Sequence, residues 1–408
     1  MRVASGVAGL PLVSSASRWV EVAPAAAAAG EVVIGAVVGL TGITAQWGKG
    51  AAETMQLAVN EINAAGGVKS LGGARLKLVV EDHESKPDIG AARTEKLAQQ
   101  KVQVLTGCVT SSVAVTAASI AERLRVPFVD GGDSSPQIVQ RGFKYVFMLR
   151  PTAIQLARKS VDFSKWAGQK TGVMPTKVAI IVQDDTAGTQ IGENALARAK
   201  EVGFNVVDYV RYSAATARDF SAPLTSCKQA GVDTIFHHGK PADTVIFVKD
   251  MKSLDFNPNY IGILGGAVDR TAVDNLKQDA EYMLGGTDFN PEAKVAADLV
   301  KRFKTATGRE MDTVAGIGYW TIGVIWGAVE AAASTDRDKI RDAIRNLRLN
   351  PGERYWVLPT PLQFNDQGLN IGADVIITQV RGGKHRPVYP ESIKTVELVW
   401  PRPRWSRG

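Results

Sequence analysis

With 408 residues the chain is too long for a single ordinary hydrophobic core, so we expect about two domains. Hydrophobic residues make up 45% and charged residues 22%, which is typical of a soluble globular protein. The formal net charge is +7, but residues 381–408 alone hold seven Lys/Arg and two Glu; the rest of the chain is close to neutral, which argues against a nucleic-acid-binding face.

The first 30 residues have the character of a signal peptide. Arg2 precedes a mildly apolar Val/Ala/Leu run, and Ala25 to Ala29 supply an A-x-A cleavage region. We therefore expect export to the periplasm and treat residues 1–30 as a signal-like segment. No later stretch reaches about 18 uncharged apolar residues, so we expect no membrane-spanning helix.

Strands and helices alternate through the first part of the chain. The apolar and amphipathic patterns predict strands at 31–38, 76–80, 102–105 and 126–129, and helices at 51–64, 88–100 and from Ser111 onward. This alternation is typical of a parallel sheet that is covered by helices on both faces.

The same pattern restarts after Arg150-Pro151. It predicts strands at 177–182, 206–212, 233–236 and 260–264, and helices at 153–168, 188–202, 219–230 and 242–251. A long connection from about Met283 leads to three helices, at 293–307, 314–333 and 336–346, and to a last strand at 375–380. The sequence therefore predicts an α/β protein with two doubly wound parallel-sheet lobes. The Pro-, Arg- and Trp-containing tail, residues 386–408, lacks periodicity, and we expect a disordered basic end.

The segment Val102–Thr116 combines a strand, a turn and a helix start that carries Ser111 and Ser112. The unpaired N–H groups and partial positive charge of a helix N-terminus can bind an anion, although these hydroxyls could also serve only as helix caps. Ligands of open parallel sheets lie beyond the carboxyl ends of the strands. We therefore expect the site in the loops at 39–48, 107–112, 130–136, 184–188, 237–241 and 264–267.

Motifs for catalysis and cofactor binding are missing or incomplete. The segment Gly48-Lys-Gly-Ala-Ala-Glu lacks the third glycine of a dinucleotide fingerprint, and no P-loop, G-x-S-x-G or H-E-x-x-H motif occurs. His237 and His238, at a strand end, are candidates for a base or a ligand pair, but no Cys/Asp/Glu pattern lies near them. We expect no enzymatic activity, no cofactor and no metal.

Two further features each allow two interpretations. Asp184 and Asp185 are either paired carboxylates or a solvated turn. Trp47, on a glycine-flanked loop, is either a core residue or a wall of the ligand site. Cys108 and Cys227 fall in different predicted lobes, so we expect no disulfide between them.

Several segments resemble the type I periplasmic binding proteins of ABC transporters, in the leucine/isoleucine/valine-binding branch. The resemblance covers about residues 31–350 and is carried by IGAVVGLTGITAQWGKGAAETMQLAVNEINAAGGV, LTGCVTSS, VPFVDGGDSSPQI, QRGFKYVFMLRP, VAIIVQDDTAGTQIGENAL and ARDFSAPLTSCKQAGVDTIF. The first is the most specific, because it joins a G-x-x-x-Q-W-G turn to the helix end NEINAAGG.

This resemblance implies two lobes, joined by three crossovers, that close over a ligand. It places the crossovers near Met148–Pro151, Met283–Asp288 and Pro361–Gly368. Lobe 1 would then comprise residues 31–149 and 286–361, lobe 2 residues 150–285 and 362–385, and the basic tail residues 386–408.

The resemblance also implies a ligand site with two halves. The first half, which holds a carboxylate under a covering side chain, falls on Trp47, Ser111, Ser112, Gly132, Asp133 and Ser134. The second half, which holds the ammonium group in amino-acid binders, falls on Ala187, Lys240 and Leu264. None of these three can accept a hydrogen bond from an ammonium, and Lys240 would repel it. Asp184, His238 and Gly265 complete the predicted lining.

The function implied is that of a monomeric solute-binding receptor of an ABC uptake transporter, which delivers its ligand to a membrane permease. The altered second half favours a small carboxylate that is not a plain branched-chain amino acid: an aromatic or aliphatic acid, a keto acid or a dicarboxylate, with Lys240 pairing a second anion or hydroxyl. The alternative is a ligand sensor for amides or acids that has the same fold and controls a regulator. A dehydrogenase-type enzyme and a sugar-operon repressor are weaker hypotheses, because the dinucleotide fingerprint is broken and the N-terminal segment supplies no helix-turn-helix.

Overall fold

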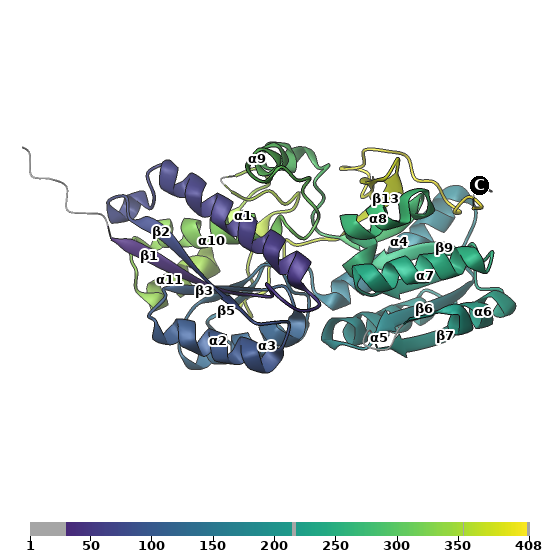
Figure 1. Ribbon diagram of the computed structural model, residues 1–408, viewed down its shortest axis with the longest axis horizontal. Coiled ribbons are helices and arrows are strands. Elements are labelled where there is room, and N and C mark those ends of the chain that lie inside the picture. The colour runs from purple at the N-terminus through teal and green to yellow at the C-terminus, as the bar shows by residue number, and fades with distance from the viewer. Residues whose placement is uncertain (1–29, 214–217, 354, 406–408) are drawn as a thin grey trace, which may run out of the picture.

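Two separate β-sheets form the centres of two lobes in the computed structural model, which describes residues 30–213, 218–353 and 355–405 (Figure 1). The first sheet has the order β2-β1-β3-β4-β5, and all its strands are parallel. Its strands are β1 (Glu31–Val38), β2 (Arg75–Asp82), β3 (Val104–Cys108), β4 (Phe128–Asp130) and β5 (Val146–Met148).

Helices cover both faces of this sheet. The apolar side chains of β1 divide by strand periodicity: Val32, Ile34 and Val38 pack into one core, and Val37 packs into the other. The first core also takes side chains from α1 (Ala45–Ala64), α9 (Ala297–Thr307), α10 (Ile317–Ala332) and α11 (Arg337–Asn346), and the second from α2 (Pro87–Gln99) and α3 (Ser111–Arg123).

The second sheet has the order β14-β13-β10-β9-β8-β6-β7. Its parallel part consists of β6 (Lys177–Gln183), β7 (Asn205–Tyr212), β8 (Thr234–His238), β9 (Asn259–Ile263) and β10 (Leu284–Thr287). β13 (Ile376–Arg381) and β14 (Lys384–Tyr389) extend it in antiparallel orientation. One core lies against α4 (Ala153–Thr171) and α5 (Thr186–Glu201), and the other against α6 (Ser221–Ala230), α7 (Pro241–Ser253) and α8 (Arg270–Leu276).

The predicted fold class is confirmed: the structure has two αβ lobes, and the chain passes between them after β5, after β10 and between β12 (Leu362–Gln363) and β13. β12 pairs with β11 (Arg348–Leu349) in a small separate sheet. Leu369 still forms a bridge to Met148 of β5, so the third passage lies later than 361–368, where the sequence placed it. Cys108 and Cys227 are buried in different cores and are not bonded to each other.

The strands β5, β11, β12 and β14 were not predicted, and at two further elements that differ from the prediction glycines mark close packing. α1 begins at Ala45, six residues earlier than predicted, so Trp47 lies in its first turn and not on a loop. A Cβ on Gly48 would overlap the carbonyl group of Gly39. β10, predicted as part of a connection, contains Gly286, where a Cβ would lie 2.8 Å from Ser160 of α4.

The expectation of a disordered tail is wrong for residues 386–405. β14 pairs with β13, and Trp400 is only 6% exposed and donates its indole N–H to the carbonyl of Val173 at 2.9 Å. The buried Arg402 lies 3.8 Å over the ring of Trp405. Anchoring by single Trp and Arg side chains leaves no periodic pattern, which is why the sequence did not reveal it.

The predicted signal-like segment, apart from Gly30, lies outside the described residues. Within the described ranges, no helix combines the length and apolar character that a membrane crossing requires.

Candidate functional site

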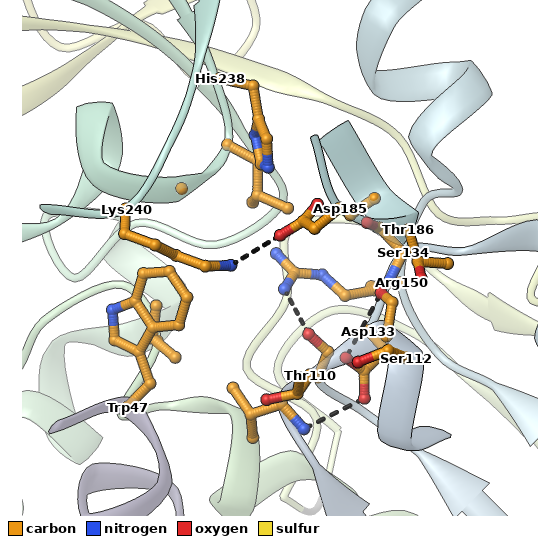
Figure 2. Close-up of a pocket in the computed structure, with 17 residues that line it drawn as sticks. Trp47, Thr110, Ser112, Asp133, Ser134, Arg150, Asp185, Thr186, His238 and Lys240 are labelled. Atoms are coloured by element: carbon orange, nitrogen blue, oxygen red, sulfur yellow. Dashed lines mark hydrogen bonds and ion pairs between the residues drawn. The ribbon is translucent and has the colours of Figure 1, made fainter. Parts of the chain in front are cut away.

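The carboxyl ends of both sheets border one pocket between the lobes (Figure 2). In each sheet the chain reverses its direction of winding at one pair of neighbouring strands, β1 and β3 in the first and β6 and β8 in the second. Such switch points are where open α/β sheets bind ligands. The segments that follow these four strands line the pocket together with those that follow β4, β5 and β9.

Eleven of the twelve predicted site residues lie around this pocket. They are Trp47, Ser111, Ser112, Gly132, Asp133, Ser134, Ala187, His238, Lys240, Leu264 and Gly265. The structure adds residues that the sequence analysis did not select: Val109, Thr110, Arg150, Asp185, Thr186 and Val314. That any of them binds a ligand remains a prediction.

Asp184 is the predicted residue that does not line the pocket. Its backbone N–H continues the pairing of β6 with β7 at Tyr212, and its half-exposed carboxylate forms an ion pair with Arg211. The next residue, Asp185, points into the pocket and caps α5 by accepting the N–H of Gly188 at 2.7 Å. An Asp between a strand end and a helix start is a typical N-cap, and that signal could have distinguished Asp185 from its neighbour.

The turn after β3 has an unusual backbone that a side chain from the loop after β4 holds in place. Cys108 and Val109 have φ values of 74° and 62°, a region that β-branched residues rarely adopt. The carboxyl group of Asp133 accepts the N–H of Val109 at 3.0 Å and lies 3.5 Å from the hydroxyl of Ser111. Asp133 therefore supports the turn that presents the start of α3 to the pocket.

The N-terminus of α3 leaves donors available. Among the described residues, no acceptor contacts the backbone N–H groups of Ser111 and Ser112, the first two residues of this 13-residue helix. The hydroxyl of Ser111 is engaged with the N–H of Ser134 at 3.3 Å. Two N–H groups at the positive end of a helix dipole can receive a carboxylate.

Buried charges lie beneath this part of the pocket. The carboxyl group of Asp130 accepts the N–H groups of Gly132 at 3.0 Å and Asp133 at 3.2 Å. Burial raises the pKa of Asp133 well above its usual value, and the neighbouring Asp130 raises it further. Burial also raises the pKa of Asp130. The pair therefore keeps a proton to higher pH than isolated carboxyl groups do, which lowers the negative charge beside the pocket.

Arg150 completes the floor of the pocket. Its guanidinium donates to the carbonyl of Gly132 at 3.0 Å and forms a buried ion pair with Asp288. The sequence analysis treated this arginine only as part of a crossover, although a charged residue two positions after the apolar β5 indicates a polar role for that position.

Lobe 2 contributes an ion pair to the opposite wall. The ammonium group of Lys240 lies 3.3 Å from the carboxylate of Asp185 and 5.0 Å from the ring centre of Trp47 (Figure 2). Burial raises the pKa of Asp185, but Lys240, His238 and the N–H of Gly188 together outweigh this effect, so the pKa is lowered. Asp185 thus supplies a counter-charge that the sequence analysis did not foresee, and the pairing of Lys240 with a second anion or hydroxyl of a ligand stays a prediction.

The two adjacent histidines of β8 point to different surroundings. His237 is buried behind the pocket, stacked 4.3 Å from Phe247, and its Nδ1 lies 2.7 Å from the hydroxyl of Tyr260. His238 lines the pocket, with Nδ1 2.7 Å from the carbonyl of Ile263. They do not form a ligand pair, and in the described part of the chain no three His, Cys, Asp or Glu side chains are grouped to hold a metal.

Trp47 connects the two lobes across the pocket mouth. Its indole N–H donates to the carboxylate of Asp269 at 2.6 Å, and Asp269 caps α8 in lobe 2. Of the two interpretations of Trp47, the structure supports the pocket wall, although the side chain is also largely buried.

Comparison with known proteins identifies relatives along nearly the whole chain. A family model described as periplasmic binding protein matches residues 31–384. The Leu/Ile/Val-binding protein homolog 8 of Brucella abortus (strain 2308) is 25% identical over 390 residues, which cover 91% of this chain and 94% of the relative.

Solved structures agree with this match. A leucine binding protein from Thermotoga maritima MSB8 has a TM-score of 0.74 and 24% identity, covering 87% of this chain and 97% of that one. A solute binding protein of an ABC transporter from R. palustris, solved in complex with benzoate, has a TM-score of 0.76 and 19% identity, covering 90% of this chain and 98% of that one. These likenesses concern the fold.

Proposed function

The chain belongs to the periplasmic binding protein family, and from this premise we propose that it is the receptor of an ABC uptake transporter for a small aromatic or aliphatic carboxylate. The observation that carries the proposal is the start of α3, where the N–H groups of Ser111 and Ser112 face the pocket without an acceptor among the described residues. A ligand carboxylate satisfies both donors and gains from the helix dipole.

The opposite wall disfavours the ammonium group of an α-amino acid. Asp185 could accept hydrogen bonds, but its carboxylate is already paired with the ammonium group of Lys240 at 3.3 Å. A ligand ammonium placed against Asp185 would lie beside Lys240, and two like charges in a partly buried site repel strongly. Ala187 and Leu264, which also line this wall, offer no acceptor side chain. This wall suits a neutral or apolar ligand end.

The names of the similar solved structures include a ligand with an ammonium group and a ligand without one. One solved structure is named a leucine binding protein, and another holds benzoate. Both ligands carry a carboxylate, and only leucine carries an ammonium group. The charge pairing of Lys240 in this chain favours the benzoate type of ligand.

The proposed transport role combines export, ligand capture and delivery. The signal-like residues 1–30 would direct the chain to the periplasm. Ligand would bind to lobe 1 first, and lobe 2 would then close over it, with the Trp47–Asp269 hydrogen bond joining the lobes at the pocket mouth. The closed receptor, acting as a monomer, would deliver the ligand to a membrane permease.

A thermal-shift and calorimetric panel tests the ligand class. Benzoate and a short 2-oxo acid should stabilise the protein by about 2.7 kcal/mol at 100-fold excess over Kd. Leucine should not stabilise it, and neither should benzamide, which has the shape of benzoate without the charge. Stabilisation by leucine alone would contradict the proposal.

A proline variant tests whether the start of α3 binds the ligand carboxylate (the carboxylate seat). Ser111 is the first residue of α3, a position that accepts proline because its N–H is not needed within the helix, and the preceding Thr110 is extended, as a residue before proline must be. Ser111→Pro removes the N–H and the hydroxyl, and Ser111→Ala removes only the hydroxyl. Ser111→Pro should bind benzoate about 10-fold more weakly than Ser111→Ala, as expected for the loss of a hydrogen bond to a charged group. Equal affinities of the two variants would refute the helix-terminus seat.

A further inference from the structure

His238 presents a buried polar atom to the pocket that has no partner within the described residues. The side chain stands at the end of β8 and is 3% exposed. Its Nε2 makes no hydrogen bond to any described residue. Figure 2 shows the ring projecting from lobe 2 toward the space between Lys240 and Asp185.

The hydrogen-bond chemistry of the ring follows from its other nitrogen. Nδ1 lies 2.7 Å from the carbonyl oxygen of Ile263, which can only accept, so Nδ1 carries the hydrogen. Burial lowers the pKa of His238, and the neighbouring Lys240 lowers it further, although Asp185 acts in the opposite direction. A neutral imidazole with its hydrogen on Nδ1 has a lone pair at Nε2, so this atom can accept a hydrogen bond and cannot donate one.

The pocket wall around His238 does not satisfy this acceptor. Lys240, a cation in the same pocket, is committed to Asp185 at 3.3 Å and to the face of Trp47 at 5.0 Å. Leu264 has no polar side-chain atom. A buried acceptor without a donor is costly, so the missing donor is a natural contribution of the ligand.

We propose that Nε2 of His238 accepts a hydrogen bond from a hydroxyl group of the ligand, and that the preferred ligand is therefore a hydroxy-substituted carboxylate. This inference rests on the proposed function, since it takes the start of α3 as the seat of the carboxylate at the other end of the same molecule. A hydroxyl suits the position better than an ammonium, because it donates without placing a positive charge beside Lys240. It also gives a role to an unpaired polar atom that lies on the same wall as the apolar side chains of Ala187 and Leu264.

Calorimetry with matched ligands tests the inference. Benzoate, 3-hydroxybenzoate, 4-hydroxybenzoate and 4-methoxybenzoate are titrated into the full chain, the methoxy compound being a control of similar size that cannot donate. At least one hydroxybenzoate should bind about 10- to 100-fold more tightly than benzoate, because a site built around a buried acceptor penalises ligands without the donor. The methoxy compound should show no such gain.

Two variants assign the effect to the imidazole. In His238→Leu the ratio of hydroxybenzoate affinity to benzoate affinity should fall to less than about 3-fold, whereas in His238→Gln, which keeps an acceptor, part of the preference should remain. Circular dichroism and Tm establish that both variants are folded. Nitrogen-15 NMR of the wild-type imidazole should show the hydrogen on Nδ1, and the Nε2 resonance should shift when the hydroxybenzoate binds.

The outcomes separate the two proposals. If benzoate binds but the hydroxyl gives no gain, or if the gain survives in His238→Leu, the inference is overturned and the carboxylate receptor stands. If NMR places the hydrogen on Nε2, the inference is overturned without reference to any ligand. If none of these acids binds, the proposed function has failed, and the inference falls with it.

Discussion

Replacing Lys240 by methionine should convert the second wall of the pocket into one that accepts amino acids. The ammonium group lies 3.3 Å from Asp185 and 5.0 Å from the ring centre of Trp47. Methionine keeps the length and the apolar contact with the ring and removes only the charge. The variant therefore isolates the electrostatic part of the argument.

The size of the effect follows from the ion-pair distance. Two unit charges 3.3 Å apart interact by about 5 kcal/mol at an effective dielectric constant of about 20. In the wild type, a ligand ammonium gains about this much from Asp185 and loses a similar amount to Lys240, so nothing remains to offset its dehydration. In the variant only the attraction remains. Because the Asp185 side chain is 28% exposed and solvent screens it, we discount the gain to about 1.5–3 kcal/mol, or roughly 10- to 100-fold in affinity.

Isothermal titration with leucine and with benzoate measures the change. Lys240→Met should bind leucine roughly 10- to 100-fold more tightly than the wild type, and benzoate several-fold more weakly, because the unpaired Asp185 repels an anion. Lys252→Met is the matched control: it removes an ammonium that pairs with Asp279 at 2.6 Å, away from the pocket, and should change neither affinity. If the folded Lys240→Met protein gains no affinity for leucine, Lys240 does not exclude amino acids and the argument is refuted.

Three further predictions follow from single side chains. Trp47→Phe removes the 2.6 Å hydrogen bond to Asp269 that joins the lobes, so benzoate affinity of the folded variant should fall about 10-fold; unchanged affinity would show that this bond does not support closure. Burial raises the pKa of Asp130 and Asp133 above the unfolded value, so stability should decline as pH rises from about 4 through the raised folded pKa values and then level off. Asp130→Asn should flatten that decline in urea unfolding, and an unchanged slope would assign it to other groups. Trp400→Ala should cost about 3 kcal/mol and lower Tm, since the side chain is 6% exposed; a neutral result would mean that the tail does not support lobe 2.

The part of the fold that periodicity encodes could be predicted from the sequence. The buried runs of β1 and β6 are strongly β-branched, and the amphipathic helices between the strands fixed the alternation of a parallel sheet. The strand β10 was not predicted because its sequence, LGGT, resembles a turn. Its glycines are there because neighbouring elements pack closely against it. The ordered structure of the tail was not predicted because single aromatic and arginine side chains hold it in place and leave no periodic pattern.

Sequence reasoning located the loops of the site better than the directions of its side chains. The loops followed from the rule that ligands bind beyond strand ends. Which of two neighbours faces the pocket depends on strand pleat and helix capping, and this decided Asp185 over Asp184 and separated His238 from His237. The pairing of Lys240 with Asp185 joins residues that are distant in sequence, so no local pattern could reveal it.

The ion pair between Arg150 and Asp288 suggests different roles for the two halves of the pocket, the carboxylate seat on lobe 1 and the wall from lobe 2. Arg150 lies on the first passage between the lobes and Asp288 on the second, and the arginine also holds the carbonyl of Gly132 beside the carboxylate seat. A buried ion pair adds little net stability compared with apolar residues, so we attribute its presence to the geometry that it fixes. In the proposed receptor it anchors the seat on lobe 1 to the connecting strands, so that the seat is formed before closure. In the same proposal, the acceptor of His238 belongs to lobe 2 and would reach the ligand when the lobes close. Closure would then favour ligands that carry both a carboxylate and a donor, and the conformational change would be the step that selects the ligand.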